Sequence, residues 1–170
     1  IGGALDGVFT VRTLADVDAM ADHFNAGKRA LIVGGGYIGL EAAAVARKMG
    51  VEVTVVEMAE RILQRVAAPD TSDYFRALHQ SHGVKIFEGV GLKSLNGEGY
   101  VSGATLANGT ELDVDFVIVG VGITPNASLA EKAGLTIENG IAVNEQGCTS
   151  DPNIWSAGDC ASFDLRGARR

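Results

Sequence analysis

The residues best suited to chemistry in this sequence are the glycines of the run GGGYIG, residues 34–39. The run follows a wholly apolar segment, residues 30–33, which is typical of a strand buried in a parallel sheet, and it precedes an alanine-rich segment that predicts a helix. This is the context in which G-x-G-x-x-G binds a dinucleotide. Gly34 would allow a sharp turn, Gly36 would leave room for a pyrophosphate, and Gly39 would let the helix pack closely. The alternative is a turn that only connects strand and helix.

Glu57 ends the next predicted strand, residues 51–56, and stands 21 residues after Gly36. The fingerprint places an acid about 20 residues on, where its carboxylate accepts hydrogen bonds from the adenosine ribose. Because that carboxylate would repel a 2′-phosphate, we expect NAD(H) to be preferred over NADP(H). Arg61 and Arg65 complicate this expectation, since a guanidinium can hold a 2′-phosphate or a pyrophosphate. The alternative is that both arginines are solvated surface charges.

Histidines and cysteines are the other candidates for chemistry. His79 and His82 are three residues apart on a predicted helix, residues 72–81, and could supply half a metal site. No acid or cysteine constellation completes it, so we interpret the pair as a polar last helical turn and expect no metal. Cys148 and Cys160 form no C-x-x-C pair and predict neither a disulfide framework nor a metal site.

The remaining predicted elements surround this strand–turn–helix unit. They are a helix over 11–25 with Thr13 as its N-cap, a helical turn over 61–66 that Pro69 breaks, strands over 84–87 and 116–119, short segments near 90–95, 100–106 and 110–114, a helical stretch over 127–133, and strands near 141–143 and 154–157. Asn-Gly pairs at 96–97, 108–109 and 139–140 predict turns, and the first two would make the three short segments an antiparallel meander. The expected fold class is α/β, with a Rossmann-like parallel sheet, flanking helices and an antiparallel β-meander crossover.

Aromatic and apolar side chains predict the core. We expect Tyr74, Phe75 and Leu78 to form the inward face of the helix over 72–81. The largest expected core side chains are Phe75, Phe87, Phe116 and Trp155.

Composition excludes several classes of protein. The chain has 170 residues, of which 46% are apolar and 21% charged, so intrinsic disorder is not expected. The net charge of −7 argues against a nucleic-acid partner. No apolar run approaches the ~18 residues that a membrane span requires. Cysteine usage and the lack of a visible signal peptide predict a cytoplasmic protein.

Three longer runs, taken together with Glu57, resemble a known family. RALIVGGGYIGLEAA, DFVIVGVGITPN and TSDPNIWSAGDCA are similar to the flavin-dependent pyridine nucleotide oxidoreductases, and most closely to the ferredoxin and putidaredoxin reductase branch. The resemblance covers nearly the whole chain, including the leading GVFTVRTLADVDA. It implies an FAD domain that is interrupted by an NAD(H) domain and followed by an interface domain. The chain would be a fragment with a leading segment (1–10), the NAD(H)-binding domain (11–126) and an incomplete return segment toward the FAD-binding domain (127–170).

The resemblance also implies a role for individual residues. Gly34, Gly36 and Gly39 match the pyrophosphate turn, Glu57 the ribose-binding acid and Asp159 the aspartate that bonds the FAD linker. The nicotinamide end would be formed by Tyr37, Ile38, the helix glutamate Glu41, and Gly122 and Ile123 before Pro125-Asn126. The implied activity is hydride transfer from NADH to FAD, with Glu41 at the catalytic junction, followed by one-electron steps to a ferredoxin-like iron–sulfur protein.

Several alternatives stay open at this stage. The chain could be a stand-alone NAD-sensing module, although the flavin-type aspartate Asp159 argues against a pure sensor. A relative of the NADH oxidases, nitrite reductases or apoptosis-inducing factor would carry the same motifs. A methyltransferase that binds S-adenosylmethionine could use a glycine turn and a strand-end acid, but the third glycine favours a dinucleotide. A homodimer is also left open.

Overall fold

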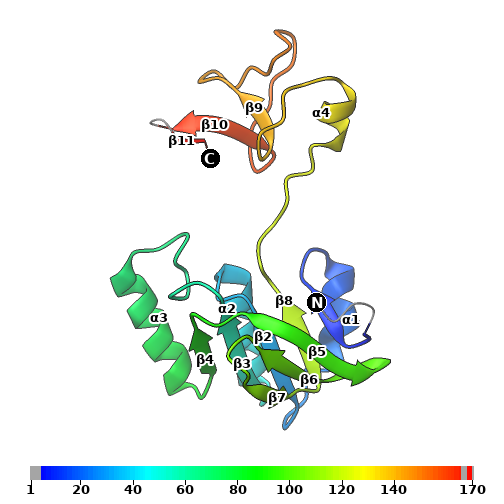
Figure 1. Ribbon diagram of the computed structural model, residues 1–170, viewed down its shortest axis with the longest axis vertical. Coiled ribbons are helices and arrows are strands. Elements are labelled where there is room, and N and C mark those ends of the chain that lie inside the picture. Colours follow the sequence, from blue (N-terminus) through cyan, green and yellow to red (C-terminus); the bar gives the residue numbers. More distant parts are fainter. Residues whose placement is uncertain (1–4, 166–167, 170) are drawn as a thin grey trace. The chain divides into compact units, whose positions relative to one another are not determined.

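A computed structural model describes residues 5–165 and 168–169 of the chain (Figure 1). Residues 1–4, 166–167 and 170, which the expected terminal segments include, lie outside the described residues. The chain divides into two compact units, Ile1–Gly122 and Ile123–Arg170, and each is described by itself. The division falls four residues before the expected boundary at 126.

The first unit is built on a five-stranded parallel sheet of order β1-β8-β2-β3-β4. The strands are β1 (Val8–Thr10), β8 (Phe116–Val119), β2 (Arg29–Val33), β3 (Glu52–Glu57) and β4 (Lys85–Glu88). From β2 the chain moves outward through β3 to β4, and it then returns to the other side of β2 as β8. Ligands of open parallel sheets bind at such a switch point, beyond the carboxyl ends of the strands. The leading segment contributes β1 to this sheet, so it is part of the first unit.

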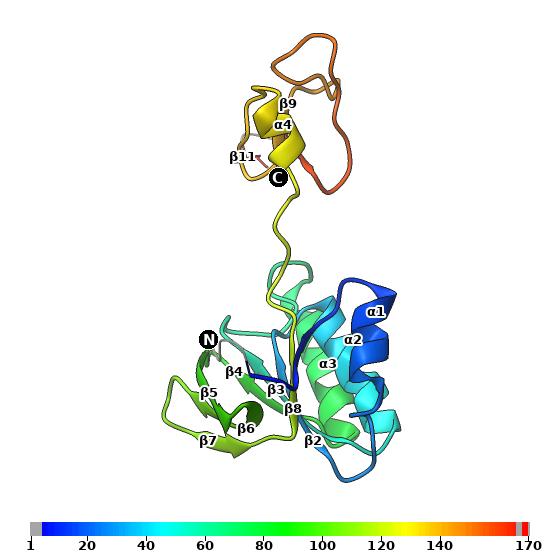
Figure 2. The same ribbon diagram turned by 90° about the vertical axis from the view of Figure 1, so that its right-hand side faces the viewer.

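Helices cover one face of this sheet and an antiparallel sheet covers the other (Figure 2). The helices are α1 (Leu14–Ala21), α2 (Tyr37–Lys48) and α3 (Pro69–Ser81). The second sheet consists of β5 (Leu92–Glu98), β6 (Tyr100–Leu106) and β7 (Glu111–Asp113), in that order. The arrangement confirms the predicted α/β class with its meander.

Strand β2 shows why residues 30–33 are wholly apolar. Ala30 and Ile32 pack into the core on the helix side, whereas Leu31 and Val33 pack into the core against the meander. Successive side chains of a strand point to opposite faces, so a strand covered on both faces needs apolar residues at every position.

Helix α1 begins where the sequence predicts. Thr13 is the N-cap of a capping box, in which the Thr13 hydroxyl accepts from the backbone of Asp16 and the Asp16 carboxylate accepts from Thr13 N. The latter bond, with a second from the Thr13 hydroxyl and a third from the backbone of Arg12, holds the pKa of Asp16 below its ordinary value. The helix ends at Ala21, earlier than the expected residue 25.

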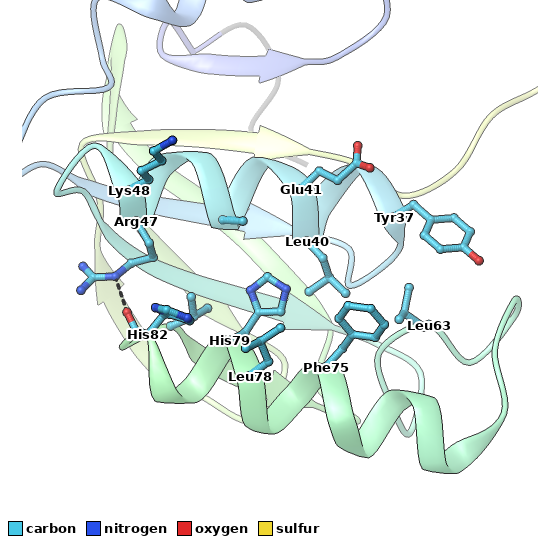
Figure 3. Close-up of a pocket in the computed structure, with 12 residues that line it drawn as sticks. Tyr37, Leu40, Glu41, Arg47, Lys48, Leu63, Phe75, Leu78, His79 and His82 are labelled. Carbon is cyan, nitrogen blue, oxygen red and sulfur yellow. Dashed lines mark hydrogen bonds between the residues drawn. The ribbon is translucent and has the colours of Figure 1, made fainter.

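The predicted inward face of α3 is wrong for Tyr74, which is 64% exposed, and holds only in part for Phe75 and Leu78. The latter two are directed toward α2 but stay 36% and 38% exposed, whereas the buried residues of the helix are Ser72 and His79 (Figure 3). The helix also begins at Pro69, because proline at the first helical position needs no hydrogen-bond partner for its nitrogen. Of the expected aromatic core, Phe116 is fully buried and Phe87 packs against the core between the two sheets.

The chain does not turn at Asn96-Gly97, where the sequence predicts the first turn of the meander. Asn96 and Gly97 belong to β5, where the pairing with β6 shifts register, and the chain turns at Gly99 with φ +75°. The turn at Asn108-Gly109 is confirmed: Gly109 N donates to Leu106 O at 3.0 Å.

The second unit contains α4 (Ser128–Lys132), β9 (Ile141–Val143), β10 (Ala161–Leu165) and β11 (Ala168–Arg169). The strands form a sheet of order β11-β10-β9. A turn at Asn139-Gly140, both with positive φ, precedes β9 as predicted. The predicted strand over 154–157 is wrong: only a single bridge joins Cys148 and Trp155, and Trp155 is exposed rather than core.

Candidate dinucleotide-binding site

The glycine turn lies at the switch point between β2 and β8. Gly34 has φ +109°, and a Cβ atom at this position would lie 2.3 Å from the carbonyl oxygen of Gly120, directly after β8. A Cβ atom on Gly39 would lie 2.0 Å from the carbonyl oxygen of Gly34. Both distances are far below van der Waals contact, so only glycine allows β2, β8 and α2 to approach this closely. Sequence reasoning missed Gly120, although a glycine directly after the apolar run 116–119 was a usable signal.

Gly36 differs from Gly34 and Gly39 because the space that its Cβ atom would occupy is open. No atom lies within 4 Å of the position that its Cβ would take, and its φ of −82° is ordinary for any residue. Gly36 is also the N-cap of α2 and provides no side-chain cap. The first N–H groups of a helix have no partner within the helix, and no side chain at Gly36 caps those of α2. This bare helix N-terminus fits a phosphate group.

The carboxylate of Glu57 is fixed beside this turn. Its Oε2 accepts a hydrogen bond from Gly35 N at 2.7 Å, and its Oε1 accepts one from Ala59 N at 2.8 Å. An ionised carboxylate has about four acceptor positions, so each oxygen keeps one for a further donor. The structure thus brings Glu57 to the glycine turn, as the sequence spacing predicts.

The loop after β3 packs directly against the glycine turn. A Cβ atom on Gly35 would lie 2.6 Å from Cγ2 of Ile62, and Leu63 N donates to Gly35 O at 2.9 Å. Gly35 therefore also has a steric role, which the fingerprint does not reveal.

A polar network holds that loop at the backbone of Ile62. Ile62 N donates to Glu88 Oε1 at 2.7 Å, and Ile62 O accepts from the hydroxyl of the buried Ser72 at 2.7 Å. Glu88 is in turn paired with Arg76, with 2.6 Å between Nε and Oε2, and this pair raises the pKa of Arg76. Arg61 donates to the Ser72 hydroxyl and to Ala67 O. The sequence analysis missed the roles of Ser72 and Glu88.

The two candidate arginines differ in what they contact. The guanidinium of Arg61 is used within the loop network, so this residue has a structural role. Arg65 is exposed and makes no hydrogen bond or ion pair with any described residue. Its Nη1 lies 3.5 Å from the position that a Cβ atom on Gly122 would take. The structure thus brings Arg65 and Gly122 together.

The other predicted site residues are exposed. Tyr37 and Glu41 lie one turn apart on α2, and Figure 3 shows the Glu41 carboxylate pointing away from α3. Ile38, on the same first turn, is 43% exposed. Ile123 and Asp159 belong to the second unit, where both are exposed.

In residues 5–165 and 168–169, no group of three or more His, Cys, Asp or Glu side chains could hold a metal ion. No helix there has the length and apolar character that crossing a membrane requires. Cys148 and Cys160 are free thiols and half-buried.

The fold and the glycine turn define a Rossmann-like α/β protein of the kind seen in FAD- and NAD-dependent reductases. Residues 1–169 match the family model described as pyridine nucleotide-disulphide oxidoreductase, and the chain belongs to this family.

Relatives with known names are ferredoxin-type reductases. The chain is 44% identical over 167 residues to the 5,5'-dehydrodivanillate O-demethylase ferredoxin reductase subunit of Sphingobium sp., covering 97% of this chain and 40% of that protein. It is 42% identical to putidaredoxin reductase of Pseudomonas putida, covering 90% of this chain and 37% of that protein.

A solved structure supports the same relationship. The covalent putidaredoxin reductase–putidaredoxin complex matches with a TM-score of 0.90 and 40% identity, covering 96% of this chain and 40% of that chain. The present chain therefore spans about 40% of the length of these relatives.

Proposed function

We propose that this chain is the NAD(H)-binding domain of a flavin-dependent NADH:ferredoxin-type reductase and presents NADH for hydride transfer to FAD. The observation that carries the proposal is the open backbone at Gly36 with the carboxylate of Glu57 fixed beside it. The names of the relatives, which are reductases of ferredoxin and putidaredoxin, support the choice of partner class.

Different residues of the turn would bind different parts of the nucleotide. The N-terminus of α2 would bind the pyrophosphate through its N–H groups, with a dipole contribution of about 1 kcal/mol. Glu57 would accept hydrogen bonds from the ribose hydroxyls with the acceptor positions that Gly35 and Ala59 leave free. Arg65 lies beside Gly122 with no partner among the described residues, so its charge would be available to a phosphate.

The nicotinamide end would be formed around the second turn of α2. Glu41 would orient the nicotinamide near the flavin, and Tyr37, Ile38 and Gly122 would line the pocket. When bound, FAD would supply the redox chemistry by accepting a hydride and releasing electrons one at a time. Asp159 would bond the linker of FAD.

Calorimetry with NADH tests the nucleotide site directly. We expect the chain to bind NADH and the Gly36→Ala variant to lose at least about tenfold in affinity, because the new methyl group occupies the phosphate position. Gly99→Ala is the control. Its new Cβ atom would meet no atom within 4 Å, but an alanine at the φ of +75° that Gly99 adopts is strained. We expect Gly99→Ala to lower stability by about 1 kcal/mol and to bind NADH normally.

Two outcomes would contradict the proposal. The first is no binding of NADH to the parent chain at millimolar concentration. The second is equal loss of NADH binding in both variants, which would mean that stability and not the phosphate position controls binding.

A further inference from the structure

A cavity of about 600 Å³ lies between α2 and α3, within the first unit. Its walls are mainly apolar and include Leu40, Leu63, Phe75, Leu78 and Val84. Figure 3 shows Leu40 directed from α2, and Phe75 and Leu78 from α3, toward the space between the two helices. The volume falls within the ~300–1,000 Å³ of small-molecule sites, and the apolar walls are typical of them.

His79 provides a polar group inside this apolar space. Its side chain is 8% exposed, yet its imidazole makes no hydrogen bond with any described residue. Figure 3 shows the ring lying between α2 and α3. The residue lines the cavity, where a ring nitrogen can donate or accept a hydrogen bond. The imidazole is therefore suited to a hydrogen-bonding group on a molecule that enters the cavity.

The charges at one end of the cavity favour an anionic group. Arg47 and His82 line this end, and the Arg47 guanidinium is held by hydrogen bonds to His82 O at 2.9 Å and Val51 O at 2.7 Å. Lys48 and Glu41, the only acid of the lining, also contribute to it, but Figure 3 shows the charged groups of both pointing away from α3. The Arg47 guanidinium therefore determines the charge at this end of the cavity.

We propose that this cavity binds a small monocarboxylate with an apolar body. The apolar body would lie against Leu40, Phe75 and Leu78, and the carboxylate would accept a hydrogen bond from His79 near the guanidinium of Arg47. This inference rests on His79 and Arg47 along the flank of α2, whereas the proposed nucleotide site centres on the N-terminus of that helix. Tyr37 and Glu41 border both sites.

The binding would depend on pH through His79. Burial, and then the nearby His82, lower the pKa of His79. The charged or titratable groups that line the cavity with His79 are His82, which caps the C-terminus of α3, and Tyr37, Glu41, Arg47 and Lys48 from α2. A bound carboxylate opposes the effect of burial by stabilising the imidazolium. Affinity should therefore rise as the pH falls from 8 to 6.

Calorimetry with three probes tests the proposal on this chain. Octanoate carries both an apolar body and a carboxylate, 1-octanol has only the body with a neutral head, and acetate has only the head. We expect octanoate to bind with one site per chain and at least tenfold more tightly than 1-octanol, and acetate to show no binding.

Two substitutions locate the site. Ala44 lines the cavity and is exposed, so Ala44→Phe would fill the cavity without disturbing the core, and octanoate binding should be lost. Val45→Phe is the matched control on the next, non-lining position, and it should bind octanoate normally. His79→Gln should lower octanoate affinity about fivefold and remove most of its pH dependence. Circular dichroism would show that each variant is folded.

Four outcomes would overturn the proposal. They are no octanoate binding at millimolar concentration, equal binding of octanoate and 1-octanol, equal binding by Ala44→Phe and Val45→Phe, or a dimer of the parent chain in sedimentation that Ala44→Phe alone dissociates. The last result would show that a second copy of the chain covers this face.

Discussion

Helix α2 borders two very different regions, one at its N-terminus and one along its flank. The N-terminal region is made of backbone: Gly36 has no atom near its missing Cβ, and Glu57 is held by main-chain N–H groups. The flank region is made of side chains from α2, α3 and the loop after β3. The first region exists because Gly36 has no side chain. The second exists because the fold brings side chains of different elements together.

This difference determines how each region responds to substitution. In the turn, one added methyl group meets rigid backbone or occupies the ligand position. Along the flank, an added or removed group meets side chains that can adjust, so smaller effects are expected. The predictions below test whether the two regions are independent.

The largest effect is expected where the turn is most crowded. Gly39→Ala would place a Cβ atom 2.0 Å from the backbone of Gly34, which cannot move without separating α2 from β2. We expect a loss of about 3 kcal/mol in the free energy of unfolding, measured by urea denaturation. Gly36→Ala, three residues earlier, should lose under about 1 kcal/mol because its Cβ meets no atom. Equal destabilisation of the two variants would contradict this account of the turn.

The strand–turn–helix unit was predictable from sequence because its constraints are local. A strand covered on both faces must be apolar throughout, as residues 30–33 are, and a helix that packs this closely on a strand needs glycine at the point of contact, as at Gly39. Such requirements appear directly as residue types at fixed spacing, so the turn and the position of Glu57 could be predicted without a structure.

The flank was not predictable because its constraints are tertiary. The face of α3 that is turned inward carries Ser72, Arg76 and His79, which apolar periodicity assigns to solvent. Ser72 and Arg76 are there because they bind a loop through Ile62 and Glu88, and no local pattern predicts those partners. The turn predicted at Asn96-Gly97 was wrong for a similar reason, because these residues lie within β5 at a register shift in its pairing with β6.

Ser72 joins the two regions, because α3 holds the loop that packs on the glycine turn. Ser72→Ala would leave the carbonyl of Ile62 without its buried partner and would remove one of the hydrogen bonds of the Arg61 guanidinium, at a cost of about 2 kcal/mol of stability. We also expect NADH affinity to fall about threefold, because the same loop carries Arg65.

A double-mutant cycle with Arg65→Ala separates the two effects of Ser72. Arg65→Ala should weaken NADH binding without lowering stability, since Arg65 is exposed and has no described partner. Adding Ser72→Ala to it should then cost little further affinity. Additive losses would mean that Ser72 does not act through Arg65.

The charge of Glu57 should control which nucleotide binds. Glu57→Gln keeps the shape but removes the charge, and we expect NADH affinity to fall about tenfold, as for a lost hydrogen bond to a charged group. NADPH affinity should fall less, so the preference for NADH should narrow. Glu60→Gln, an exposed acid in the same loop, is the control. Equal affinities of the parent chain for NADH and NADPH would refute the role of Glu57.

The smallest effect concerns the flank and is read from the pH dependence of stability. The pKa of His79 is lowered in the folded chain, chiefly by burial, so below pH ~6.5 the unfolded chain binds more protons than the folded one. Stability contributed by neutral His79 is fully present above that pH and is lost as the pH falls toward the folded pKa.

Urea denaturation at pH 5 and pH 7 should therefore show a larger gain in stability with pH for the parent chain than for His79→Gln. Asp16, whose pKa is also shifted, is the same in both proteins, so its titration cancels in the difference. Saturating octanoate should shrink the difference, because a carboxylate at the imidazole opposes the effect of burial on the pKa of His79. If the difference is unchanged by octanoate, the ligand lies elsewhere, and the flank of α2 is a packing surface rather than a binding site.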